Sequence, residues 1–125
     1  MTENELSKII VNTAYQIHKT LGPGLLESVY EEIMYFELKN HGLQVERQKA
    51  IPVTWNGLKM EIGFRADLIV ENKVIIELKS VEILAPVHSK QLLTYLKLTG
   101  LKLGLLINYN ESLIKDAIHR IVNNL

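Results

Sequence analysis

The segment GFRADLIVENKVIIELKSV, residues 63–81, contains two apolar runs on either side of the polar triplet Glu-Asn-Lys at 71–73. A short polar triplet between two such runs predicts a β-hairpin. If Val70 pairs with Val74 across a three-residue turn, the register places Asp67 opposite Glu77, and it places the two cations Arg65 and Lys79 opposite each other. A two-residue turn would instead shift the register and separate the carboxylates.

The two faces of this hairpin differ in character, because side chains alternate along a strand. One face is nearly all apolar and should pack on helices: Phe64, Ala66, Leu68, Val70, Val74, Ile76, Leu78 and Ser80. The other face mixes aliphatic and charged side chains: Arg65, Asp67, Ile69, Ile75, Glu77, Lys79 and Val81. The charged face is therefore the first place to look for chemistry.

Two hypotheses account for the charges on that face. Opposed carboxylates repel each other, and a hard divalent cation such as Mg²⁺ or Mn²⁺ between Asp67 and Glu77 would remove the conflict, because such ions prefer oxygen ligands. Lys79, on the same strand face as Glu77, could then orient or deprotonate a water near a phosphodiester, or neutralise the transition state. Alternatively, the four charges form a plain ion-pair network, with Arg65 on Asp67 and Lys79 on Glu77.

The composition is that of an ordinary globular domain. At 125 residues the chain forms one domain, 1–125, with a core of its own. It has no cysteine, so disulfides and thiolate metal sites are excluded. The first residues lack the regions of a signal peptide, and no apolar run approaches the roughly 20 residues that span a bilayer. We expect a cytoplasmic protein with no membrane partner.

The formal net charge is zero. This is evidence against a protein that coats nucleic acid non-specifically, because such proteins usually carry a basic excess. A net charge of zero is still compatible with a local basic groove around an acidic metal centre.

The N-terminal part of the chain predicts two helices. Thr2 and Glu5 have the form of a capping box at the start of a helix that ends near Leu21. The Gly-Pro-Gly triplet at 22–24 breaks it. A second helix is expected over 25–41, ended by Gly42 in a left-handed conformation. Its expected core stripe is Leu26, Val29, Ile33 and Phe36.

Strands and further helices follow. Residues 43–48 and 51–55 predict extended segments, with Pro52 at an edge or bulge, and Asn56-Gly57 predicts a tight hairpin with Trp55 opposite Leu58. Pro86 suits the first turn of a helix that runs to about Thr99.

The C-terminal part completes the expected fold. Residues 101–107 predict a strand covered on both faces, parallel to its neighbour through a right-handed crossover. Asn110 is expected to cap a final helix with the stripe Leu113, Ile114, Ala117, Ile118 and Ile121. The predicted fold class is α/β (an α+β sandwich), a mixed sheet flanked by helices, with an antiparallel meander plus one parallel strand.

Three residues share one face of the helix at 86–99, because His88, Gln91 and Tyr95 are spaced by three and four residues. This is either a solvated helix face or a group aimed at the metal centre or a substrate phosphate. Glu27, near the start of the second helix, either complements the helix dipole or supplies a third carboxylate to the metal.

Several motifs together resemble one family. Residues 24–30, GLLESVY, match the G-x-x-E-x-x-Y signature of the GxxExxY proteins, and FRAD, IIELK, PVHSKQLLTYL and LGLLIN also look like that family. The resemblance covers nearly the whole chain. The family is placed in the PD-(D/E)xK nuclease-like superfamily, whose core is a helix, three strands, a helix and a strand.

The resemblance implies roles for particular residues. Asp67, Glu77 and Lys79 would be the signature residues, with Ala66 where the superfamily name has proline. Glu27 would be a catalytic and metal-binding helical carboxylate beside Asp67 and Glu77, and Gln91 a catalytic residue of the following helix. The residues expected to contact substrate are Arg65, Tyr95, His88 and Tyr30.

The implied activity is hydrolysis of nucleic-acid phosphodiester bonds by a Mg²⁺- or Mn²⁺-dependent nuclease. The alternative is a catalytically inactive module on the same scaffold that binds nucleic acid or protein, because fold does not determine function. A chain this short offers little substrate-binding surface, which makes a homodimer a further hypothesis. No basic stripe or aromatic platform distinguishes DNA from RNA.

Overall fold

A single five-stranded sheet organises the molecule, with its strands in sequence order β1-β2-β3-β4-β5. The structure is a computed structural model that describes residues 1–125, apart from the side chains of residues 61 and 62. The strands are β1 (Val45–Trp55), β2 (Leu58–Val70), β3 (Val74–Lys79), β4 (Leu103–Asn108) and β5 (Ile118–Val122). Neighbouring strands are antiparallel except β3 and β4, which are parallel.

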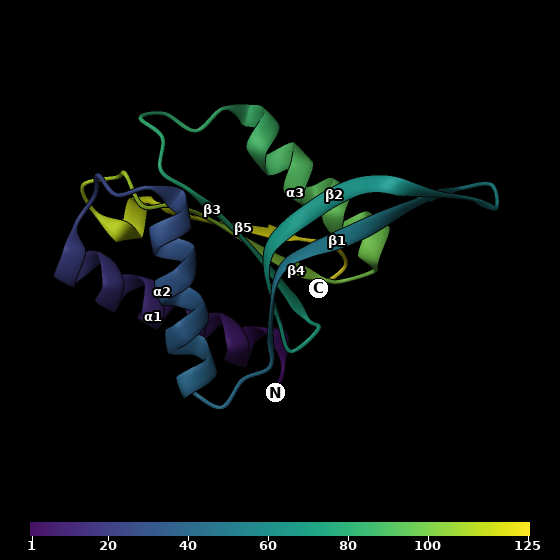
Figure 1. Ribbon diagram of the computed structural model, residues 1–125. Helices are drawn as coiled ribbons and strands as arrows, with labels where there is room; N and C mark the ends of the chain where they lie inside the picture. Colours follow the sequence, from purple (N-terminus) through teal and green to yellow (C-terminus); the bar gives the residue numbers. More distant parts are fainter.

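Helices cover both faces of the sheet. α1 (Glu3–Leu21) and α2 (Glu27–Asn40) lie on one face, and α3 (Pro86–Thr99) lies on the other (Figure 1). α3 packs so closely that a Cβ on Gly104 of β4 would come within 2.8 Å of the Leu92 side chain. The expected mixed sheet with flanking helices is confirmed.

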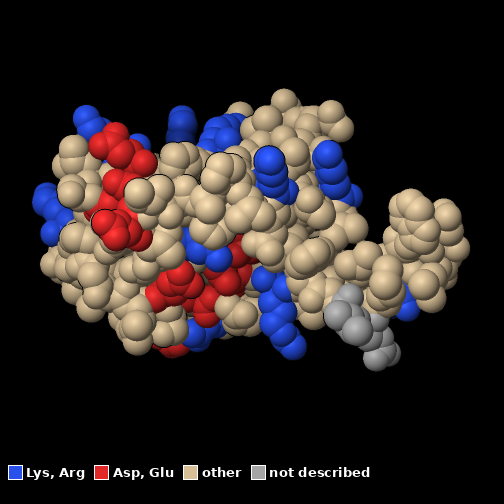
Figure 2. All heavy atoms as spheres, turned by 90° about the horizontal axis from the view of Figure 1, so that it is seen from above, with Lys and Arg blue, Asp and Glu red and all other residues tan. Residues whose placement is uncertain are grey.

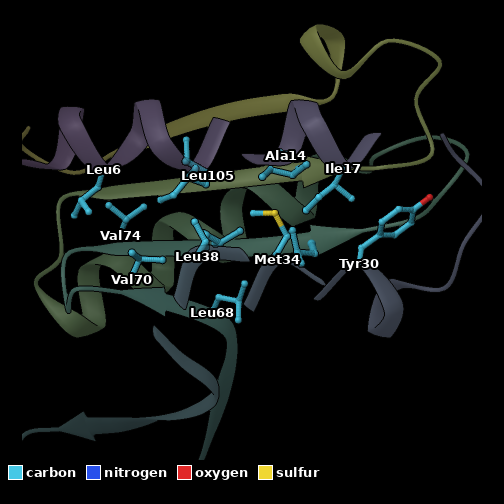
Figure 3. Packing of buried hydrophobic residues seen from close by; sticks show 14 of the residues in the cluster. Leu6, Ala14, Ile17, Tyr30, Met34, Leu38, Leu68, Val70, Val74 and Leu105 are labelled. Carbon is cyan, nitrogen blue, oxygen red and sulfur yellow. The ribbon is translucent and has the colours of Figure 1, made fainter. Parts of the chain in front are cut away.

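α1 begins and packs as its sequence predicts. Thr2 and Glu5 form the reciprocal capping box. The helix then buries one apolar stripe against the sheet and α2 (Figure 3). The buried side chains of that stripe are Leu6, Ile10, Ala14 and Ile17. Neither α1 nor any other helix of the described residues is long and apolar enough to cross a membrane.

The stripe predicted for α2 is wrong. The helix buries Tyr30, Met34 and Leu38, whereas Leu26 lies before the helix and Phe36 is 60% exposed. Apolar residues occur around much of this helix, so its spacing alone does not select a face. A long-range contact selects it: the Tyr30 ring stacks on Tyr109, which follows β4, with centroids 4.1 Å apart.

The hairpin of β1 and β2 forms as Asn56-Gly57 predicts. Trp55 pairs with Leu58, and both turn residues have positive φ, 46° and 84°, as a type I′ turn requires. The register shifts between Ile51 and Val53, at Pro52. Opposite this bulge, a Cβ on Gly63 would lie 2.0 Å from the Ile51 carbonyl oxygen, so the bulge requires glycine at that position.

The hairpin of β2 and β3 has the predicted Val70–Val74 pair, but it is shorter than predicted. Paired residues end at Leu68 and Ile76, so the expected pairing of Arg65 with Lys79 does not form and Arg65 instead pairs with Ala50 of β1. Of the predicted apolar face, five residues pack towards α1 and α2 as expected: Leu68, Val70, Val74, Ile76 and Leu78. Phe64 and Ala66 of that face instead pack on the α3 side.

The change of face in β2 falls beside an irregular residue of β1. Gln48, which lies between the residues paired with Leu68 and Ala66, has a left-handed backbone with φ of 51°. The pairing on either side of it keeps one register, and the change of face falls at Asp67.

The predicted C-terminal helix is wrong. Residues 114–116 form a single 3₁₀ turn, η1 (Ile114–Asp116), and the following residues form β5 antiparallel to β4. Ile118 packs on the α1–α2 side, whereas Ile121 packs on the α3 side. β-branched residues favour a strand, and β4 would otherwise leave an unpaired edge.

Candidate active site

The candidate site lies where β2 and β3 separate. Beyond the Leu68–Ile76 pair the strands no longer bond to each other, and the Asp67 carboxylate reaches across instead. Its Oδ2 accepts a hydrogen bond from the Leu78 backbone N–H at 2.8 Å. Asp67 is thereby held at the end of the hairpin, next to Glu77.

Glu77 is the most unusual residue of the site. It is only 7% exposed, and its Oε1 is buried without a hydrogen-bond partner. Burial, followed by the neighbouring Asp67 charge, raises the pKa of Glu77 to about 9. Burial also raises the pKa of Asp67, against the opposing effect of the Leu78 hydrogen bond. The two carboxyl groups therefore share a proton near neutral pH.

Lys79 is half-buried and faces this pair. Its positive charge lowers the pKa of both Asp67 and Glu77, although burial outweighs that effect at each carboxyl group. The Lys79 backbone is fixed by β4, because its carbonyl oxygen accepts a hydrogen bond of 2.9 Å from Tyr109 N–H. The structure thus brings Asp67, Glu77 and Lys79 together.

Glu31 is a site residue that the sequence analysis did not identify. The amide of Gln48 donates to Glu31 Oε1 and also to Asp67 Oδ1, the latter at 3.2 Å. Glu31 is buried and pairs with Arg47 Nε at 2.8 Å. Its negative charge contributes to the raised pKa of Asp67. The available signal was its position one helical turn after Glu27, on the same face of α2.

Glu27 does not take the place expected of a third metal ligand. Its Oε1 accepts a hydrogen bond from Ser80 N–H at 3.2 Å. Among the described residues, no three His, Asp or Glu side chains are grouped closely enough to hold a metal ion. Glu27 does line a cavity of about 190 Å³, whose other lining residues are Ser28, Glu31, Gln48, Asp67 and Leu78.

Side chains of α3 close the site from the other face of the sheet. Tyr95 is buried, and burial raises its pKa to about 12, with smaller contributions from the charges of Glu77 and Asp67. Gln91 lies one turn earlier and is half-buried. His88 has a local role, because its Nδ1 accepts a hydrogen bond from Ala85 N–H at the start of the helix. A contact between His88 Nδ1 and substrate would have to replace this hydrogen bond.

The remaining two expected substrate contacts differ in accessibility. Arg65 is exposed, and its guanidinium donates to the Gln48 carbonyl oxygen at 3.0 Å, next to Asp67. Tyr30 is fully buried. Its hydroxyl donates to Gly22 O at 2.6 Å and accepts from Leu25 N–H. This geometry gives Tyr30 no access to substrate; it fixes the loop that precedes Glu27.

Figure 2 shows how charged side chains are distributed on one face of the molecule. One group of Asp and Glu side chains lies near the middle of this face and another lies towards its left side, with Lys and Arg side chains scattered between and around them.

A family model described as the PD-(D/E)XK nuclease superfamily matches residues 4–121. The chain belongs to this superfamily, and nucleases of the superfamily generally use divalent metal ions. Neither a curated protein nor a solved structure gives a match. GxxExxY remains a resemblance carried by residues 24–30.

Proposed function

We propose that this domain is a Mg²⁺- or Mn²⁺-dependent nuclease that hydrolyses nucleic-acid phosphodiester bonds at Asp67, Glu77 and Lys79. The observation that carries the proposal is the unpartnered Glu77 Oε1, buried next to a second carboxyl group. Leaving such an oxygen unpaired costs free energy. Carboxylate oxygens are the ligands that hard divalent ions prefer, so the donor set fits such an ion.

Each residue has a role that follows from its place. Asp67 and Glu77 would hold the ion, which when bound would lower the pKa of a water and stabilise charge on the phosphoryl oxygens. Lys79 would orient the attacking water or offset the charge that develops on the phosphate. Tyr95 is protonated at neutral pH, as any tyrosine with a pKa of 10 or above is, and would donate a hydrogen bond within the site. Gln91 would position substrate from the same helix.

A catalytically inactive nucleic-acid-binding or protein-binding module is the second candidate. It is favoured by the absence of a third metal-binding side chain near the pair, within the part of the chain that the structure describes. Such a module should keep its partner affinity when Asp67 is changed. A homodimer and a cytoplasmic location stay predictions.

The two candidates are separated by metal binding and cleavage measured on matched variants. We expect Lys79→Ala to retain stabilisation by Mn²⁺ in thermal unfolding but to lose cleavage of DNA and RNA panels. Asp67→Asn should lose both, and Lys97→Ala, on the exposed last turn of α3, should behave like the wild type. Loss of metal binding in Lys79→Ala would contradict the separate roles. A wild type that binds nucleic acid without cutting it would favour the inactive module.

A further inference from the structure

The hairpin of β1 and β2 extends beyond the rest of the domain as an arm (Figure 1). We define the arm as residues 53–60, which follow the bulge and pair with each other as Val53–Met60, Thr54–Lys59 and Trp55–Leu58. Before the bulge, Ile51 is buried in the cluster that packs on α3. The arm therefore begins where α3 no longer covers the sheet.

The tip of the arm exposes a pair of large apolar side chains. Trp55 is 69% exposed and its cross-strand partner Leu58 is 60% exposed. Trp55 is the single tryptophan of the chain. Exposed large apolar side chains at the end of a projecting ribbon indicate a surface that another molecule covers.

The arm and its base carry a small positive charge. Residues 49–65 contain Lys49, Lys59 and Arg65 against the single acidic residue Glu61, a net charge of +2, so the rest of the chain has a net charge of −2. Lys49 is paired with Glu46, and both Lys59 and Arg65 are exposed. Lys59 is exposed next to the apolar pair. Cations that flank an apolar or aromatic tip match the phosphates and bases of nucleic acid.

The base of the arm is joined to the candidate active site. Phe64 packs its ring on Tyr95, with centroids 4.9 Å apart, and Arg65 donates to Gln48 O beside Asp67. At about 3.3 Å per residue, the strand from Asp67 to Leu58 spans at most about 30 Å. That distance is roughly nine base pairs of B-form duplex.

We propose that the arm docks in the major groove of double-stranded DNA, up to about one helical turn from the phosphodiester at the active site. Trp55 and Leu58 contact the groove, and Lys59 contacts phosphates. A two-stranded ribbon fits this groove, which is about 12 Å wide in B-form DNA, whereas the major groove of A-form RNA is too deep and narrow for side chains. The inference rests on the proposed nuclease function and names its substrate class.

Trp55 itself reports the contact, because its emission is the only tryptophan signal of the protein. The Asp67→Asn protein would be titrated with 6-bp and 18-bp DNA duplexes carrying a fluorescein label, and tryptophan emission and label anisotropy would be followed together. We expect the 18-bp duplex to change Trp55 emission and the 6-bp duplex, about 20 Å long, to leave it unchanged. An 18-bp RNA duplex should also leave it unchanged.

A matched pair of variants tests the energetics. We expect Trp55→Ala to weaken binding of the 18-bp duplex about tenfold, as the loss of one large aromatic contact in an interface implies, and to leave 6-bp affinity unchanged. Tyr15→Ala, which removes an exposed aromatic from α1, should change neither. Far-ultraviolet circular dichroism of Trp55→Ala checks that the fold is kept.

Several results would overturn the proposal. These are absence of binding to the 18-bp duplex, binding without any change in emission, unchanged affinity of Trp55→Ala, or an equal response to the RNA duplex.

Other results would assign the tip or the domain differently. If the emission changes with protein concentration in the absence of DNA, and sedimentation shows a dimer, the tip contacts a second copy of the chain instead. Wild-type protein that responds to DNA without cutting it would refute the nuclease function alone, and cleavage without an emission response would refute the arm alone.

Discussion

Replacement of Glu77 by glutamine should make the protein more stable, and increasingly so as the pH rises. The glutamine keeps the size of the side chain but cannot ionise. In the wild type, the folded state raises the pKa of Glu77 from 4.5 to about 9, so the folded state binds more protons than the unfolded state between these values. The free energy of unfolding of the wild type must therefore fall as the pH rises through this window.

The size of the effect follows from the same linkage. One proton corresponds to about 1.4 kcal/mol per pH unit, so the advantage of Glu77→Gln over the wild type should grow by up to about 2.7 kcal/mol from pH 6 to pH 8. With an unfolding entropy of about 2.1 cal/mol/K per residue, this is a difference in Tm of about 10 °C for a chain of 125 residues.

The assay is thermal unfolding at pH 6 and pH 8, with and without Mn²⁺. At a concentration 100 times its Kd, a ligand of the folded state adds about 2.7 kcal/mol to the free energy of unfolding. We expect Mn²⁺ to stabilise the wild type but not Glu77→Gln. The gain should be larger at pH 8, because metal binding must displace the proton that Asp67 and Glu77 share. Glu82→Gln, at an exposed carboxylate after β3, is the control and should follow the wild type. A Tm difference between Glu77→Gln and the wild type that is equal at both pH values would refute the reasoning and favour the ion-pair network.

Two further variants test the scaffold. Gly63→Ala should lower the free energy of unfolding by at least about 1 kcal/mol, because its Cβ would lie 2.0 Å from Ile51 O; unchanged urea unfolding would argue against the tight bulge. Tyr109→Phe should stabilise the protein by about 1 kcal/mol, because it removes a buried hydroxyl that has no hydrogen-bond partner. A loss of stability in urea unfolding of that variant would indicate a partner for the hydroxyl.

Local chemistry explains what the sequence predicted well. Asn56-Gly57 and the Glu-Asn-Lys triplet at 71–73 fix their hairpins through turn geometry, which depends on a few adjacent residues. The second of these turns sets the Val70–Val74 register and so brings Asp67 next to Glu77. The capping box of α1 is equally local.

The predictions that the structure contradicts concern contacts between residues far apart in the sequence. The face of α2 is selected by Tyr30 stacking on Tyr109, and β5 forms because β4 offers an edge that no local pattern reveals. Glu31 reaches the site through the amide of Gln48. The spacing of Glu27 and Glu31 puts both carboxylates on one face of α2, but it does not predict the bridge to Asp67, which depends on the left-handed Gln48 of β1.

The placement of α1 has a consequence for synthesis of the chain. Its apolar stripe packs against residues of β4 and η1 in one cluster, and His18 near its end bonds to the carbonyl oxygen of Glu111, 93 positions later. Ribosomes add roughly 5–20 residues per second, so α1 is synthesised about 5–20 s before these partners. During that interval the apolar stripe of α1 is open to chaperones and to premature association with other nascent chains.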